Sequence, residues 1–190
     1  MPAPISDEQN RRDREALLDT AEGLFYAHGI RAVGMDAVRA GSGLPLKRIY
    51  RFFPAKEDLV VETLRRRDRR WRGDLAEYVG RVSDPRGRVS AMFDWLSEWF
   101  ARPGFRGCAW INAFGEMGTA SEAVLAEVRG HKEAFRSQVE EWVRDAGGGR
   151  EEAEAVFLLA EGAIVTAGIS GDPGPARRAR AVAERLLEQC

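Results

Sequence analysis

The chain has 190 residues, of which 44% are hydrophobic, and its 29 Lys and Arg nearly balance its 30 Asp and Glu. This is the composition of an ordinary protein with a buried core in one or two domains. Two cysteines are too few for a disulfide framework, and no Cys or His cluster has zinc-ligand spacing, so we expect no structural metal and no cofactor. The amino terminus lacks the apolar core of a signal peptide, which favours a cytoplasmic location.

The net charge of −1 conceals an asymmetry along the chain. Residues 1–72 contain 15 Lys and Arg against 11 Asp and Glu, whereas residues 73–190 contain 14 against 19. A basic amino-terminal third points to a polyanionic partner, although a solvated arginine-rich helix would have the same composition.

Helical periodicity predicts an all-α fold with about nine helices. A first helix ends at His28 and Gly29, with glycine in the usual stop position. Two short helices follow, one around Met35 and one from Pro45 to Phe53. They are separated by a glycine-bearing turn, and Lys56 then begins a much longer helix.

The carboxy-terminal part is also predicted to be helical. One helix begins at Pro85, and another is opened by Thr119 and Glu122, which have capping-box spacing. The nearly apolar segment Ala153–Ile169 is shorter than the roughly 20 residues that a membrane-spanning helix needs, so we expect it to be buried and expect no membrane partner. A final amphipathic helix follows the turn GDPGP.

The two short helices and their turn have the geometry of a helix-turn-helix, whose second helix enters the major groove of DNA. On that second helix, Ile49 and Phe53 are four residues apart and are expected to face inward. The face expected to point outward is basic and aromatic and consists of Lys47, Arg48, Tyr50 and Arg51. Cations there can neutralise phosphates, and Lys47 or Arg48 could reach a guanine edge.

The stretch LLDTAEGLFYAHGIRAVGMDAVRAGSGLPLKRIYRFFPAKEDLV resembles the TetR-like (tetracycline-repressor-like) transcriptional regulators, and the resemblance covers residues 14–60. It implies a DNA-binding domain at residues 10–58, with its helix-turn-helix at about 35–54, and a helical effector-binding and dimerisation domain at residues 59–190. In this family the residues matching Tyr50 and Lys56 contact DNA phosphates. The expected DNA-binding residues are Leu46, Lys47, Arg48, Tyr50, Arg51, Phe52 and Lys56.

The chain departs from the family pattern at Gly34, Pro45, Lys47 and Arg48, where the family usually has small or hydroxyl-bearing residues. We therefore expect different contacts at the starts of both short helices. Lys56 lies in the first turn of a helix, where a cation opposes the helix dipole. A DNA phosphate bound there would remove this conflict, and so would the neighbouring Glu57 and Asp58.

The second domain resembles one TetR subgroup in FRGCAWINAFGE, which implies an effector pocket enclosed by the central helices. The candidate pocket residues are Trp95, Trp99, Cys108, Trp110, Asn112, Glu116, His131 and Phe135. The aromatic residues and His131 also fit an ordinary core, and Asn112 and Glu116 also fit an exposed pair. Cys108 fits either an oxidant sensor or a small buried side chain.

The last two helices are predicted to form an isologous dimer interface. Its candidate residues are Phe157, Glu161, Val165, Arg178, Val182 and Leu186. The predicted function is a homodimeric, sequence-specific repressor that leaves a palindromic double-stranded DNA operator when an apolar or aromatic small molecule binds. The alternatives are an activator with the same fold, or a helical ligand-binding protein or enzyme whose basic stretch does not bind DNA. We expect no catalytic residues, because P-loop, dinucleotide-binding, HExxH and GxSxG motifs are all missing.

Overall fold

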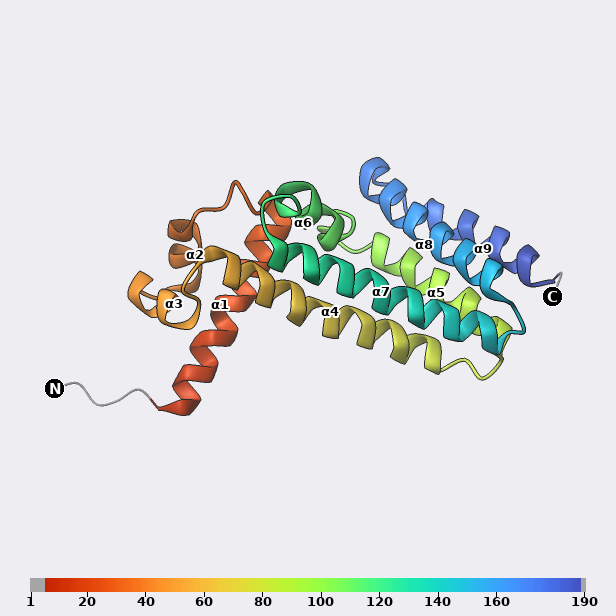
Figure 1. Cartoon of the computed structure of the whole chain (residues 1–190), viewed down its shortest axis with the longest axis horizontal. Coiled ribbons are helices and arrows are strands. Elements are labelled where there is room, and N and C mark those ends of the chain that lie inside the picture. The colour runs from red at the N-terminus through yellow and green to blue at the C-terminus, as the bar shows by residue number, and fades with distance from the viewer. Residues whose placement is uncertain (1–5, 189–190) are drawn as a thin grey trace. The chain divides into compact units, whose positions relative to one another are not determined.

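The computed structural model describes residues 6–188, and this part of the chain is all helical, with nine helices (Figure 1). The helices are α1 (Asp7–His28), α2 (Met35–Ser42), α3 (Leu46–Phe52), α4 (Lys56–Gly80), α5 (Pro85–Phe100), α6 (Ala109–Met117), α7 (Glu122–Asp145), α8 (Arg150–Ser170) and α9 (Gly174–Glu188). The predicted fold class is confirmed.

Local sequence accounts for most helix ends. Ser6 caps α1 by accepting a hydrogen bond from the Gln9 amide, and Asp84 caps α5 in the same way, with Pro85 at the first helical position. The predicted cap of α7 is wrong. Thr119 lies in a turn that follows α6, and the Ser121 hydroxyl instead accepts from the Val124 amide at 3.0 Å.

The described residues form two compact units. The first, the head, extends to Arg67 and includes Asn112–Val128; the second contains Asp68–Ile111 and the residues from Arg129 onwards. Three helices, α4, α6 and α7, therefore contribute to both units. These units differ from the domains expected from sequence, which remain a prediction.

In the head, α1 packs against α2, and α2 against α3. Its core is apolar and includes the fully buried Leu17, Leu18, Val38, Ile49 and Leu59. Ion pairs join α4 to α1: Arg66 pairs with Glu15 and Asp19, and Arg67 with Glu22 at 3.0 Å. Arg66 and Arg67 thus face α1.

In the second unit, α8 and α9 lie side by side and both contact α5 (Figure 1). Gly168 in α8 meets the backbone of Gly107, and a Cβ atom at residue 168 would lie only 2.8 Å from the Gly107 Cα. Two glycines are therefore needed where these segments cross.

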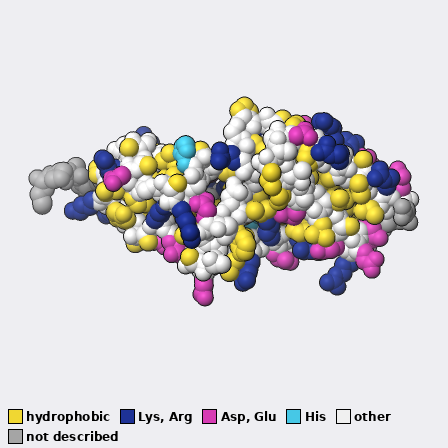
Figure 2. All heavy atoms as spheres, turned by 90° about the horizontal axis from the view of Figure 1, so that it is seen from above, with side chains coloured by type: hydrophobic (Ala, Val, Ile, Leu, Met, Phe, Trp, Pro, Cys, Tyr) yellow, Lys and Arg dark blue, Asp and Glu magenta, His cyan; other side chains and the backbone are white. Residues whose placement is uncertain are grey.

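The helix α8 is longer than the sequence pattern suggested. It has 21 residues, and its most apolar window has a mean hydropathy of 1.5, so length and composition alone would allow it to cross a membrane. In this structure 39% of that window is buried, and the helix packs on α5 and α9. The face drawn in Figure 2 carries acidic and basic side chains interspersed with apolar ones, in keeping with the small net charge.

Candidate DNA-binding surface and effector cluster

The helix-turn-helix consists of α2, a short turn and α3. The turn begins at Gly43, whose φ of 69° is left-handed and favours glycine. Pro45 precedes α3 as its N-cap, and its carbonyl accepts from the amides of Arg48 and Ile49. Neither Gly34 nor Pro45 makes a side-chain capping bond. Both short helices thus begin without a hydroxyl side chain as cap, as the sequence indicated.

One side of α3 is buried and the other is exposed, as the spacing predicted. Ile49 and Phe53 are buried, whereas Lys47, Tyr50 and Arg51 are exposed, with 43% of Tyr50 accessible. Within residues 6–188 these three exposed side chains make no hydrogen bond or ion pair. They are therefore available to an external partner. The neighbouring Leu46 and Phe52 are half-buried.

The outward orientation expected for Arg48 is wrong. Its side chain is only 10% exposed and pairs with Asp13 of α1 at 2.6 Å. The guanidinium also donates to Asn10 at 3.0 Å and lies over the Phe52 ring. A planar guanidinium can serve several such partners at once, so Arg48 joins α3 to α1.

Lys56 begins α4, and its ammonium is held within the head. Its Nζ donates to the Ile30 carbonyl at 2.5 Å. Burial lowers the pKa of Lys56, and the negative charge of Glu116 opposes that effect. Lys56 is thus a partly desolvated cation at a helix start.

Glu116 and Asn112 belong to the head and are not part of the second unit. The Glu116 carboxylate accepts from the Ile30 amide at 2.9 Å and from the Arg31 amide at 2.7 Å. Glu116 thus contacts the α1–α2 loop, and its role in orienting an effector stays a prediction. Asn112 is exposed.

Five of the candidate pocket residues surround a residue that the sequence reasoning missed, Trp71. Its ring centroid lies between 5.1 and 6.4 Å from those of Trp95, Trp99, Trp110, His131 and Phe135. Trp71 is 6% exposed, and its indole N–H has no hydrogen-bond acceptor among the described residues. Its helical spacing with Leu64 and Leu75 indicated the apolar side of the long helix, but not which aromatic residues lie against it.

His131 is the buried titratable group of this cluster. Its ring stacks on Trp110 with centroids 3.4 Å apart, and its Nδ1 lies 2.7 Å from Asp68 Oδ1. Burial lowers the pKa of His131 to about 4, although the hydrogen bond with Asp68 works to raise it. Burial alone would raise the pKa of Asp68, but hydrogen bonds with His131 and Arg72 hold it below its usual range. Because the ionised carboxylate only accepts, the neutral imidazole carries its proton on Nδ1.

Cys108 and Glu161 both contact Lys132. The Cys108 thiol is buried, and Lys132 Nζ lies 3.5 Å from its sulfur. The same ammonium forms an ion pair with Glu161 at 2.6 Å. Glu161 is thus engaged inside its own unit, although it was expected at a dimer interface.

The predicted dimer residues divide into buried and exposed ones. Phe157 is 5% exposed and packs near Phe135 within its own subunit, and its place at an interface stays a prediction. Val182 and Leu186 are half-buried, and Arg178 is exposed and pairs with Asp172. The apolar surface of α8 is a stripe of exposed side chains. It consists of Leu158, Val165 and Ile169.

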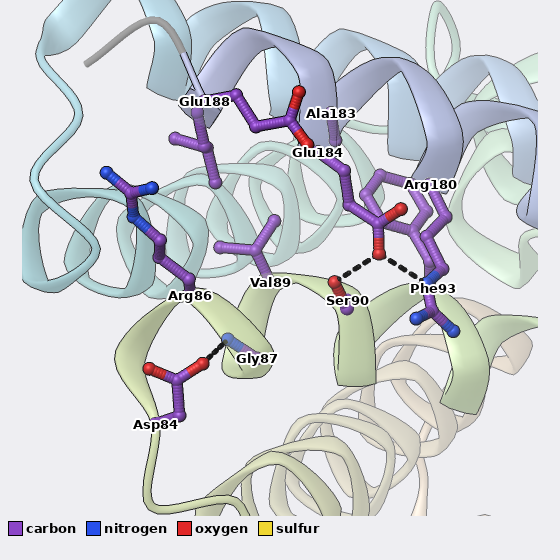
Figure 3. Close-up of a pocket in the computed structure, with 11 residues that line it drawn as sticks. Asp84, Arg86, Gly87, Val89, Ser90, Phe93, Arg180, Ala183, Glu184 and Glu188 are labelled. Carbon is purple, nitrogen blue, oxygen red and sulfur yellow. Dashed lines mark hydrogen bonds and ion pairs between the residues drawn. The ribbon is translucent and has the colours of Figure 1, made fainter.

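An open pocket of about 330 Å³ lies between α5 and α9 (Figure 3). Its wall combines polar and apolar side chains, and within it Glu184 accepts from Ser90 at 2.7 Å and from Arg180 at 2.8 Å. A second open pocket lies between the end of α7 and the start of α8. None of the candidate effector residues lines either pocket.

Comparisons with known proteins agree with this geometry. The family model described as bacterial regulatory proteins, tetR family, matches residues 17–63. The chain is 40% identical over 52 residues to the uncharacterised HTH-type transcriptional regulator YxaF of Bacillus subtilis (strain 168), and the match covers 27% of each chain.

Two solved structures match nearly the whole chain. SCO4454, a TetR-family transcriptional regulator from Streptomyces coelicolor, is 29% identical with a TM-score of 0.87, over 94% of this chain and 96% of that one. The reduced form of NemR from E. coli is 22% identical with a TM-score of 0.82, over 92% and 97%, and shares the fold.

Proposed function

We infer that this chain, which belongs to the TetR family of DNA-binding bacterial regulatory proteins, represses transcription from a palindromic operator and leaves it when a small molecule binds. The observation that carries the proposal is the exposed face of α3, where Lys47, Tyr50 and Arg51 have no partner within residues 6–188. A face of this composition suits a DNA major groove, where cations neutralise phosphates and side chains reach base edges.

The proposed roles within the DNA-binding set follow from what each side chain contacts. Lys47 and Arg51 would face the groove, and Tyr50 and Lys56 would bind phosphates. Arg48 is 10% exposed and paired with Asp13, so its proposed role is to hold α3 against α1. The half-buried Leu46 and Phe52 would contribute apolar contact at most.

Regulators of this family act as homodimers, and we propose that α8 and α9 form the interface here. The stripe of Leu158, Val165 and Ile169 supports this, since it exposes apolar side chains along one helix. An isologous contact would cover the stripe with its own copy on the second subunit. Two α3 helices related by this symmetry would reach successive major grooves of a palindrome.

For the effector we propose an apolar or aromatic molecule bound among the aromatic side chains around Trp71. The clustered rings and the unpaired indole N–H support a planar ligand with at least one hydrogen-bond acceptor. Release from DNA requires that this ligand bind the DNA-free state more tightly than the DNA-bound state. Regulators of this family are generally not enzymes, and a cytoplasmic location is proposed with the same function.

The decisive experiment is a mobility-shift titration with duplexes from the DNA that flanks the protein's own gene, at two salt concentrations. Tyr50→Ala and Lys56→Ala should each weaken binding to DNA. Each should also reduce the magnitude of the slope of log K, where K is the DNA-binding constant, against the logarithm of the salt concentration by about 0.9 per lost phosphate contact. Arg129→Ala is the matched control, because it removes an exposed cation of α7 outside the head.

The proposal fails if no duplex binds more tightly than bulk DNA, or if Tyr50→Ala and Lys56→Ala bind as wild type does. In vitro transcription from the bound promoter distinguishes a repressor, which lowers the transcript level, from an activator, which raises it. The alternative of a ligand-binding protein or enzyme would gain support only if no duplex binds more tightly than bulk DNA.

A further inference from the structure

One peptide group of the α1–α2 loop lies between two opposite charges. The Arg31 amide donates to Glu116 Oε2 at 2.7 Å, and the carbonyl of the same peptide, that of Ile30, accepts from Lys56 Nζ at 2.5 Å. The Ile30 amide donates to the other carboxylate oxygen at 2.9 Å. Both ends of the peptide thus make charge-assisted hydrogen bonds, and each bond polarises the peptide so that the other is strengthened.

The backbone next to this peptide leaves room for the carboxylate. Gly29 has a φ of 90°, which favours glycine, and a Cβ atom there would lie 3.3 Å from both Glu116 oxygens. A larger residue at this place would therefore strain the loop and crowd Glu116. The contact thus depends on a specific backbone conformation as well as on charge.

Glu116 comes from α6, a helix that also carries Trp110 of the aromatic cluster. Other residues of Asn112–Val128 bind the amino-terminal part of the head as well. Ser121 donates to Glu57, and Glu127 pairs with Arg65 at 2.6 Å. These two bonds reach α4, whereas Glu116 reaches the loop that leads into α2. Glu116 is therefore placed to act on the helix-turn-helix itself.

Lys56 retains the capacity to bind DNA in this arrangement. An ammonium has three N–H donors, and the Ile30 carbonyl takes one of them. The remaining donors can bind a phosphate, provided that the side chain stays oriented. The carboxylate of Glu116 supports this orientation through the shared peptide.

We propose that Glu116 is a positioning residue for operator binding: through the Ile30–Arg31 peptide it holds the α1–α2 loop and orients the Lys56 ammonium toward a DNA phosphate. The proposal rests on the proposed function, because it assigns a role within the same DNA-binding surface. A movement of α6 that withdraws the carboxylate would release the loop and Lys56 together, and operator affinity would fall.

The test is a double-mutant cycle on the operator duplex identified by the titration above. Glu116→Gln removes the charge at nearly constant shape, and we expect about tenfold weaker binding, equivalent to about 1.4 kcal/mol. The slope of log K against log salt should fall by about the same amount as in Lys56→Ala. The double variant should bind no more weakly than Lys56→Ala, because the two residues act as one unit.

Matched controls separate positioning from a general effect of charge or folding. Glu133→Gln removes an exposed carboxylate of α7 and should leave operator affinity unchanged. Glu116→Asp keeps the charge and should recover part of the affinity. In the wild-type protein, hydrogen exchange should find the Ile30 and Arg31 amides protected, a measurement that needs no variant to fold.

The outcomes distinguish this inference from the proposed function. If Lys56→Ala weakens operator binding while Glu116→Gln does not, or if the two losses simply add, the role of Glu116 is refuted and the regulator function stands. Rapid exchange of the Arg31 amide would also refute it. If Lys56→Ala has no effect on a duplex that binds, the phosphate role of Lys56 is lost and the inference fails with it.

Discussion

Lowering the pH from 7 to 5 should destabilise the protein through the buried imidazole of His131. Its pKa is about 4 in the folded protein against an ordinary 6.5, because burial disfavours the charged ring. In the unfolded chain the imidazole takes up a proton as the pH falls through 6.5, while the folded protein resists protonation until about pH 4. A folded pKa below the unfolded one therefore gives stability that is present above pH 6.5 and is lost as the pH falls.

The size of the effect follows from the two pKa values. The full difference corresponds to about 3 kcal/mol, at about 1.4 kcal/mol for each pKa unit, and about 2 kcal/mol of it should be lost between pH 7 and pH 5. Asp68 adds little in this range, because its depressed pKa affects stability only below its ordinary value of 3.8.

Urea denaturation at a fixed protein concentration, repeated at several pH values, measures this loss. In His131→Gln the drop between pH 7 and pH 5 should shrink by about 2 kcal/mol. His28→Gln is the matched control, because His28 is exposed and is the other histidine of the chain. The reasoning is refuted if His131→Gln keeps the wild-type drop, or if an NMR titration finds His131 titrating near 6.5.

Two further experiments test the second unit. Replacing both Leu158 and Ile169 by Glu should convert the proposed dimer into a folded monomer, because charges would enter an apolar contact. Light scattering measures the mass, and an unchanged mass would exclude the exposed stripe of α8 as the interface. Gly168→Ala should lower the free energy of unfolding by about 1–3 kcal/mol, because its Cβ atom would overlap Gly107. The control is Gly130→Ala in α7. A Cβ atom there meets no atom within 4 Å, so this variant should raise the free energy of unfolding by about 0.5–1 kcal/mol. Equal melting temperatures for these two glycine variants would contradict the close approach of the backbones.

Local sequence was sufficient to predict the elements of the helix-turn-helix. Glycine and proline positions indicated where α1 ends and where α2 and α3 begin, because these residues act on the backbone of their own segment. The four-residue spacing of Ile49 and Phe53 identified the buried side of α3, and the exposure of Tyr50 on the other side followed from the same period.

The tertiary structure decided the partners of the charged residues. Arg48 has the spacing of an exposed residue, yet it is covered because Asp13 and Asn10, more than 30 residues earlier, lie beside it. Glu116 was expected to face a ligand, but it binds amides 85 and 86 residues away. Periodicity identifies which side of a helix is apolar, but it carries no information on which distant segment lies opposite a polar side chain.

The same limit explains the aromatic cluster and the exposed apolar stripe of α8. The sequence placed aromatic residues on several helices, but only packing brought Trp71 to their centre and stacked Trp110 on His131. In the nearly uniformly apolar α8, no hydrophobic period separates the two sides, so the sequence could not tell that Phe157 is buried and Leu158 exposed. Sequence by itself determined the helices and the exposed side of α3, because both depend on neighbours in the chain. The tertiary structure decided which residues meet, because those contacts depend on how distant helices pack.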